Sequence, residues 1–436
     1  MADVTQAKEM VRELVPQMRA WRRDFHKYAE SGWTEFRTAS IAARTLLDLG
    51  FEVTLGRDAL SGPDRMGVPD EDVLEQHGKR ALEQGGDAEL IERMKGGYTA
   101  FWADMVCGNG DGPTIAIRFD MDANDCTESR DQKHIPTREG FASVNPQVMH
   151  ACAHDGHTAV GMAVAAIVAK YKNQINGRVR LMFQPAEEGV RGALPMVKAG
   201  AVKGVDLVIG LHIADFADDL DLFVCGSTKF LATTKMDAIF HGKSAQGGSR
   251  PEQGRNALLA ATTATNNLYA ISRHSAGPTR VCVGKITAGE GRNVVAPHAR
   301  MVLETRGDSS ELNKYMEGEA RRIIAAAAEM WNCTHEIITM GAAESVISDQ
   351  WTIDFLEDVA KEMGVHGKIQ REGRCLGSDD FTFMMKEVQD NGGHGSYCLV
   401  GSPLVSSHHS ATMDWDEESM PRSAEILIRA IWKFLR

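Results

Sequence analysis

The feature that most constrains the fold is an alternation of short apolar segments with segments of helical periodicity. Apolar strand patterns occupy 114–120, 178–183 and 205–212, and helical patterns occupy 158–171 and 192–199. Strands that alternate with helices form largely parallel sheets covered by helices on both faces. The sequence therefore predicts an α/β protein with a mostly parallel sheet between helices and reactive groups at the carboxyl ends of the strands.

A second pattern interrupts the first. Between residues 227 and 341 the order becomes strand, helix, strand, strand, helix, which is typical of a small two-layer α+β domain. We expect it to be inserted into the first domain, so that the first domain comprises 1–226 and 342–436. The N-terminal segment 4–49 predicts two amphipathic helices, and a polar, Gly-rich insertion lies near 58–97.

Composition narrows the functional class. The chain has 436 residues, of which 43% are hydrophobic and 25% charged, and this balance is typical of a globular protein with two domains. A formal net charge of −12 without a Lys/Arg run argues against a nucleic-acid partner and favours a small-molecule substrate. No apolar run reaches the length of a signal peptide or a membrane span, so we expect a cytoplasmic protein without membrane contact.

The densest chemical signal is the run His150-Ala-Cys-Ala-His-Asp-Gly-His157, which precedes a helical pattern. Cys152 and His154 lie two residues apart and can converge on one ion from an extended loop, because thiolate and imidazole both bind transition metals well. The alternative is a histidine-rich helix start with no ligand. Such clusters are rarely only structural, so we favour a metal site.

Adjacent carboxylates follow the strand at 178–183. Of Glu187 and Glu188, one can bind a metal while the other takes a proton from water that the metal activates. Taken alone, this pair is more often a solvated surface loop. His212 and His409 are each more often core or surface histidines than ligands. Together with the Cys/His run they complete a plausible ligand set.

These blocks, in this order, resemble the amidohydrolase branch of the aminoacylase and carboxypeptidase metallohydrolase family, close to the aminobenzoyl-glutamate hydrolase type. The resemblance covers nearly the whole chain. Further matching blocks are Glu30-Ser-Gly-Trp-Thr-Glu35, Arg65-Met-Gly-Val-Pro69, Asp120-Met-Asp122, Gly254-Arg-Asn-Ala257, Gly291-Arg-Asn-Val-Val295 and Gly377-Ser-Asp-Asp380.

The resemblance implies roles for particular residues. The family's general base falls on Glu187, and its metal ligands fall on Cys152, His154, Glu188, His212 and His409. Ligand softness favours Zn²⁺, whereas the resemblance points to Mn²⁺, as one ion or two. The inserted domain is expected to act in dimerisation or as a lid, which implies a homodimer. Asp122 is expected to hydrogen-bond to a metal-binding residue and orient it without contacting the metal. The alternative is that Asp122 only caps a helix or stabilises a turn.

One departure from the family pattern carries weight. Relatives present a histidine that stabilises the oxyanion of amide cleavage in the neighbouring protomer, and this chain has Gln246 there. Loss of such a donor typically lowers the rate about 10²- to 10³-fold. Glutamine still donates a hydrogen bond but carries no positive charge. Smaller departures are Ala153, where relatives have glycine, and Asn124, where they have leucine.

This departure favours a reaction that spreads negative charge into an aromatic ring. We therefore expect hydrolytic deamination of 5-nitroanthranilate to 5-nitrosalicylate and ammonia, as in 5-nitroanthranilate aminohydrolase. The alternatives are an amidohydrolase that cleaves p-aminobenzoyl-glutamate or a related N-acyl amino acid, and an inactive binding or scaffold relative. Gln246, Asn293 and Arg306 are candidates to hold the substrate's carboxylate or nitro oxygens, although Arg306 is as readily a strand arginine paired with an acid.

Overall fold

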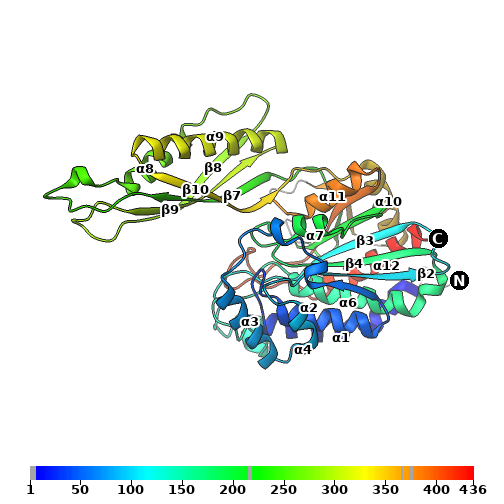
Figure 1. Ribbon diagram of the computed structural model, residues 1–436. Helices are drawn as coiled ribbons and strands as arrows, with labels where there is room; N and C mark the ends of the chain where they lie inside the picture. The colour runs from blue at the N-terminus through cyan, green and yellow to red at the C-terminus, as the bar shows by residue number, and fades with distance from the viewer. Residues whose placement is uncertain (1–5, 215–218, 365–366, 374–376) are drawn as a thin grey trace. The chain divides into compact units, whose positions relative to one another are not determined.

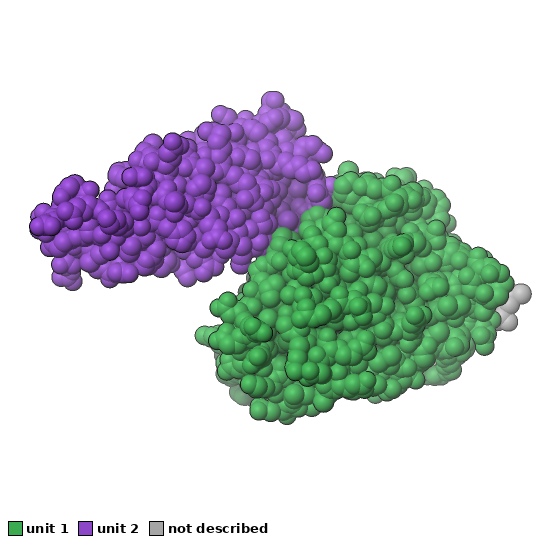
Figure 2. Space-filling model, viewed as in Figure 1, with its two compact units in different colours: residues 1–228, 346–375, 380–436 green, residues 229–345, 376–379 purple. Residues whose placement is uncertain are grey.

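The computed structural model describes residues 6–214, 219–364, 367–373 and 377–436, and Figure 1 shows its helices and strands. The chain divides into two compact units, coloured separately in Figure 2. The first unit comprises Met1–Thr228, Val346–Cys375 and Asp380–Arg436. The second comprises Lys229–Ser345 and Leu376–Asp379. The first unit is therefore built from three segments of the chain, with most of the second unit interposed.

The first unit contains an eight-stranded sheet in the order β1-β2-β4-β3-β5-β12-β6-β11. Neighbouring strands among β4, β3, β5 and β12 run parallel, whereas β1, β2 and the β12–β6 pair add antiparallel contacts. The bounds are β1 (Glu52–Leu55), β2 (Phe101–Cys107), β3 (Thr114–Asp120), β4 (Gly177–Gln184), β5 (Leu207–Ile213), β6 (Leu222–Ser227), β11 (Lys368–Gly373) and β12 (His394–Val400). The predicted α/β class with a mostly parallel sheet is confirmed, and the antiparallel pairings make the sheet a mixed one.

Helices of the first unit pack around this sheet. Their bounds are α1 (Ala7–Lys27), α2 (Phe36–Asp48), α3 (Glu71–Glu83), α4 (Ala88–Arg93), α5 (Ile135–Glu139), α6 (His154–Tyr171), α7 (Ala193–Ala199), α10 (Gln350–Glu362), α11 (Phe381–Asp390) and α12 (Ser419–Phe434). Helix α6 lies tight against the sheet, because a Cβ at Gly161 would come 2.8 Å from the rings of Phe119 and Phe183.

The N-terminal predictions correspond to observed elements. Helices α1 and α2 occupy the segment predicted as two amphipathic helices, although Val4 and Thr5 of that segment lie outside the described residues. The polar insertion near 58–97 forms α3 and α4, which pack against α2. This insertion therefore belongs to the first unit.

The second unit is a four-stranded antiparallel sheet in the order β10-β7-β9-β8. Its elements are β7 (Ala232–His241), α8 (Ala257–Tyr269), β8 (Thr279–Ala288), β9 (His298–Gly307), α9 (Ser310–Met330) and β10 (Thr334–Ala343). Small residues of α8, such as Ala260 and Ala264, share an apolar core with Met301 and Ile324. The order strand, helix, strand, strand, helix matches the prediction, and β10 adds a further strand.

Within the described ranges, no helix combines the length and the apolar character needed to cross a bilayer.

Candidate active site

The parallel centre of the sheet positions the candidate site. The carboxyl ends of parallel strands lie at one edge of a sheet. Strand β3 ends at Asp120, just before Asp122, and β4 ends shortly before Glu187 and Glu188. Strand β5 carries His212 near its carboxyl end. Three neighbouring strands thus deliver acidic and imidazole side chains to the same edge.

The Cys/His run forms a loop that leads into α6. Ala153 has a φ of 66°, in the left-handed region that favours glycine, and α6 begins at the next residue, His154. This turn places the Cys152 Sγ 3.5 Å from the His212 Nε2. The ligand atoms of Cys152, His154 and His212 all lie within 4.8 Å of one another. These two histidines are buried, and Cys152 is half-buried.

The Glu187–Glu188 turn lies beside this loop, and Asp122 holds it there. The backbone N–H groups of Glu187 and Glu188 donate to the two Asp122 carboxylate oxygens, each at 2.9 Å. The Glu187 Oε2 lies 4.0 Å from the His154 Nε2. The Glu188 Oε1 lies 3.3 Å from the ring of His409, a residue 58% exposed in its side chain. Cys152, Glu188 and His409 form a second group with ligand atoms within 4.8 Å.

The structure therefore brings together all of the residues that were predicted as ligands, along with the predicted base. Asp122 also contacts His154, whose Nδ1 lies 2.8 Å from the Asp122 carbonyl oxygen. This contact leaves the His154 Nε2 facing the cluster. Asp122 thus contacts both the His154 ring, through its carbonyl oxygen, and the backbone of the Glu187–Glu188 turn, through its carboxylate.

The charges of the site fit a bound cation. The buried His154 Nε2 has no hydrogen-bond partner among the described residues. Burial favours the neutral imidazole, but the carboxylates of Asp120, Asp122 and Glu188 outweigh it and raise the pKa of His154 to about 10. Without a metal, the negative charge of the site therefore attracts a proton to this ring. Thiolate, imidazole and carboxylate donors together suit a divalent transition metal.

A third group, Asp120 with His154 and His157, adjoins the site and was not singled out from the sequence. The Asp120 Oδ1 lies 2.5 Å from the His157 Nδ1, and the His157 Nε2 accepts the N–H of Ile213 at 3.0 Å. Because both ring nitrogens of His157 have partners within the protein, we interpret it as a brace between β3, α6 and β5. The Cys/His run contains His157 itself, but no local pattern connects it with the distant partner Asp120.

A buried ion network supports the start of α6 from outside the cluster. Arg22 on α1 is 1% exposed and contacts Asp155 at 3.0 Å and Asp414 at 2.7 Å. The His26 ring lies between the carboxylates of Asp155 and Glu128, at 2.8 and 2.9 Å. Burial would lower the pKa of His26, but hydrogen bonds to these two carboxylates raise it. No sequence pattern indicated this network, because its members are scattered along the chain.

The three predicted substrate-binding residues lie in the second unit. Gln246 and Asn293 are exposed neighbours, since the N–H of Gly247 donates to the Asn293 carbonyl oxygen at 2.8 Å. The Gln246 Oε1 accepts the N–H groups of Gly248 and Ser249 within its own turn. The Arg306 guanidinium pairs with Glu304 at 2.8 Å, which is the ion pair considered as its alternative role.

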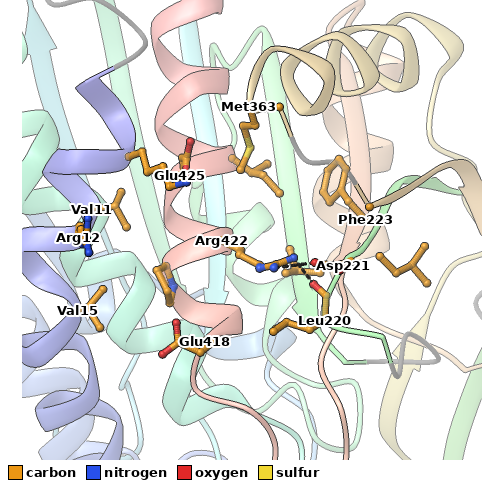
Figure 3. A pocket seen from close by; sticks show the side chains of 17 residues that line it. Val11, Arg12, Val15, Leu220, Asp221, Phe223, Met363, Glu418, Arg422 and Glu425 are labelled. Atoms are coloured by element: carbon orange, nitrogen blue, oxygen red, sulfur yellow. Dashed lines mark hydrogen bonds and ion pairs between the residues drawn. The ribbon is translucent and has the colours of Figure 1, made fainter.

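A cavity of about 630 Å³ in the first unit, shown in Figure 3, is lined by none of the cluster residues. It lies among α1, α12 and β6, with Val11, Phe223 and Ile426 in its apolar lining. The Arg422 guanidinium in its wall pairs with Asp221 at 2.7 Å. Of the two regions, only the Cys/His/Glu cluster has the grouped donors of a metal site.

The mixed sheet, the separate antiparallel unit and the clustered Cys, His and Glu side chains define a metal-dependent hydrolase. The family comparison agrees, because the model of the peptidase family M20/M25/M40 matches residues 116–433. The chain belongs to this family.

Individual relatives match along the whole chain. The chain is 47% identical to the indole-3-acetyl-aspartic acid hydrolase of Enterobacter agglomerans, with 96% of each chain covered. It is 44% identical to one of the subunits of the p-aminobenzoyl-glutamate hydrolase of Escherichia coli, with 98% of each covered. The crystal structure of the aminobenzoyl-glutamate utilization protein from Klebsiella pneumoniae superposes with a TM-score of 0.85 at 40% identity, over 98% of each chain.

Proposed function

We propose that this chain hydrolyses the amide bond between an aromatic acyl group and an acidic amino acid, as in p-aminobenzoyl-glutamate or indole-3-acetyl-aspartate. The observation that carries the proposal is the full-length match to two relatives whose names state these activities. The cluster around His154 and Glu187 supplies suitable chemistry. The products are an aromatic carboxylic acid and a free amino acid.

The proposed metal ligands are Cys152, His154, Glu188, His212 and His409, and Mn²⁺ and Zn²⁺ are the ions proposed. A divalent metal bound there would polarise the amide carbonyl and make a water molecule more acidic. Glu187 accepts the proton of the attacking water and returns it to the departing amide nitrogen. Its position 4.0 Å from the His154 Nε2 supports this role. Asp122 orients His154 and carries the turn that bears Glu187.

The comparisons favour this reaction over the deamination of 5-nitroanthranilate that the sequence pattern suggested. That expectation depended on Gln246, which would replace a charged oxyanion donor. The Gln246 side-chain oxygen caps its own turn through Gly248 and Ser249, which gives the residue a local structural role. An exposed glutamine in that role is weak evidence for a different reaction.

We further propose that the second unit mediates homodimerisation. We also propose that the side chains of Gln246 and Asn293 form hydrogen bonds with the substrate. Asn293 lies beside the Gln246 turn, which supports a joint role. Arg306 is the weaker candidate, because its guanidinium is already paired with Glu304.

The proposal is tested by loading the purified chain with Mn²⁺ or Zn²⁺ and supplying three substrates in parallel. We expect release of p-aminobenzoate from p-aminobenzoyl-glutamate and of indole-3-acetate from indole-3-acetyl-aspartate. We expect no ammonia from 5-nitroanthranilate. Release of ammonia alone, without cleavage of either amide, would refute the proposed function and restore the deaminase.

A further inference from the structure

The segment Glu30-Ser-Gly-Trp-Thr-Glu35 carries two buried glutamates whose side chains bind different parts of the protein. The Glu30 Oε1 accepts the backbone N–H of Arg37 at 3.0 Å, and its Oε2 accepts that of Thr38 at 2.9 Å. These amides belong to the first turn of α2, where backbone donors lack partners within the helix. Glu30 therefore caps α2.

Glu35 occupies the N-cap position of α2 but makes no capping hydrogen bond to that helix. Its side chain points instead to a part of the chain 151 residues away. The Glu35 Oε1 accepts the N–H of Ala186 at 2.8 Å, and the Thr99 hydroxyl donates to its Oε2 at 2.7 Å. Glu35 is 0% exposed. Glu35 therefore does not cap α2, although it occupies the N-cap position, and its carboxylate binds the turn that bears Glu187.

Glu35 and Asp122 together hold three consecutive backbone amides. Asp122 accepts the N–H groups of Glu187 and Glu188, and Glu35 accepts the N–H that precedes them. Ala186 has a φ of 51°, a left-handed conformation that costs an alanine free energy and needs support from its surroundings. Gly32 packs directly against Ala186, since a Cβ at position 32 would lie 3.0 Å from the Ala186 Cα.

We infer that Glu35 is a positioning residue that holds the Ala186 amide so that Glu187 faces the reacting water. This inference rests on the proposed role of Glu187 as the base. Without the Glu35 acceptor, the Ala186 N–H loses its hydrogen bond, while Asp122 still accepts the next two amides and the Ala186 carbonyl oxygen still accepts the N–H of Arg191. We expect Ala186 then to relax out of its left-handed conformation. Glu187, at the next residue, then moves away from its position beside His154. A displacement of about 1 Å at a catalytic group can lower turnover about 10²-fold.

The inference is tested with Glu35→Ala and Glu35→Gln, and with Glu30→Ala as the matched control. The glutamine carbonyl oxygen can still accept from Ala186, while its NH₂ group can donate to the Thr99 hydroxyl. Glu30→Ala removes a carboxylate that is equally buried but caps α2 only. Thr99→Val weakens the same support more mildly and serves if Glu35→Ala does not accumulate as folded protein.

The first readout is hydrogen exchange of the peptide that contains residues 184–190, followed by mass spectrometry on protein without added metal. We expect exchange about tenfold faster in Glu35→Ala, and unchanged exchange in Glu35→Gln and Glu30→Ala. This measurement does not depend on catalysis, so it decides the positioning role even if the proposed substrates are not cleaved. Unchanged exchange in Glu35→Ala would overturn the inference.

The second readout is steady-state hydrolysis of p-aminobenzoyl-glutamate. We expect Glu35→Ala to lower kcat about 10- to 100-fold with KM within about twofold of the wild type. Glu35→Gln should restore most of kcat, and Glu30→Ala should lower the melting temperature without changing kcat. If Glu35→Gln is as defective as Glu35→Ala, or if Glu30→Ala lowers kcat equally, the specific link to Ala186 is wrong.

Discussion

Replacement of Arg22 by methionine tests the buried network behind the Cys/His loop. Arg22 is 1% exposed and neutralises Asp155, which lies next to His154, as well as Asp414. Its guanidinium carbon also lies 4.9 Å from the ring centre of Trp415. Methionine keeps much of the apolar stem but removes the charge, so two buried carboxylates lose their main partner.

Removal of one partner from a buried ion pair typically lowers the free energy of unfolding by about 3–5 kcal/mol, because the remaining charge stays desolvated. We expect a loss in this range at pH 7. The adjacent Arg23 is the matched control, since its side chain is 37% exposed where it pairs with Glu417. Such surface pairs are worth about 0–1 kcal/mol. Arg23→Met should therefore change the free energy of unfolding little.

The pH dependence gives a second check. Burial would raise the pKa of Asp155, but Arg22 and His26 outweigh it and hold this pKa well below its usual range. A depressed carboxyl pKa stabilises the fold above the unfolded value of about 3.9, and this stability is lost as the pH falls through the folded value. In Arg22→Met the Asp155 pKa rises. The variant's deficit should therefore be largest well above the Asp155 pKa of the folded variant and shrink as the pH falls through that value.

The assay is urea unfolding followed by tryptophan fluorescence, because six of the seven tryptophans lie in the first unit. The reasoning would be refuted by a loss of less than about 1 kcal/mol at pH 7, given that breaking a buried pair predicts at least three times as much. A deficit that grows as the pH falls below neutrality would also contradict it.

Three further predictions concern the same unit. Glu187→Gln should lower kcat about 10²- to 10⁴-fold with unchanged metal content by elemental analysis, and unaltered turnover would rule out the base. Because the pKa of His26 is raised in the folded state, it stabilises the fold fully below about pH 6.5 and less as the pH rises through the folded value. In His26→Gln, the free energy of unfolding in urea should therefore fall less between pH 6 and 9 than in the wild type, and an unchanged pH dependence would exclude this linkage. Gly32→Ala should lower kcat, because its Cβ would lie 2.5 Å from the Arg191 Nη2 and 3.0 Å from Ala186; wild-type kcat would show that the turn tolerates displacement.

The grouping of the candidate ligands could be predicted from the sequence only in part. Cys152 and His154 share one run whose spacing indicated metal chemistry, whereas the adjacent Glu187 and Glu188 are weak evidence alone and took their roles from the family resemblance. The structure adds the groups that hold these blocks. Glu35 belongs to one of the family-like motifs, but its partner Ala186 lies 151 residues away, and no local pattern connects them.

Among the strands, β2 (Phe101–Cys107) was missed in the sequence for a similar reason. It contains Asp104 in an apolar run, which weakens a strand pattern. The structure explains the acid, because Arg180 on the neighbouring strand donates to both Asp104 oxygens at 2.9 and 2.8 Å. The run along 114–120 also carries charged residues, Arg118 and Asp120, which pair with each other. Its apolar residues were sufficient for it to be correctly predicted as a strand.

The sheet order has a consequence for synthesis of the chain. Strand β12 lies between β5 and β6, although it is made almost 170 residues after β6. Until residue 400 leaves the ribosome, the facing edges of β5 and β6 have no partner, and unpaired edges invite aggregation. All but the last short piece of the second unit is a single contiguous segment and can fold first. Chains terminated before β12 should therefore contain a folded second unit attached to an unfinished first unit, a substrate suited to chaperones and proteases.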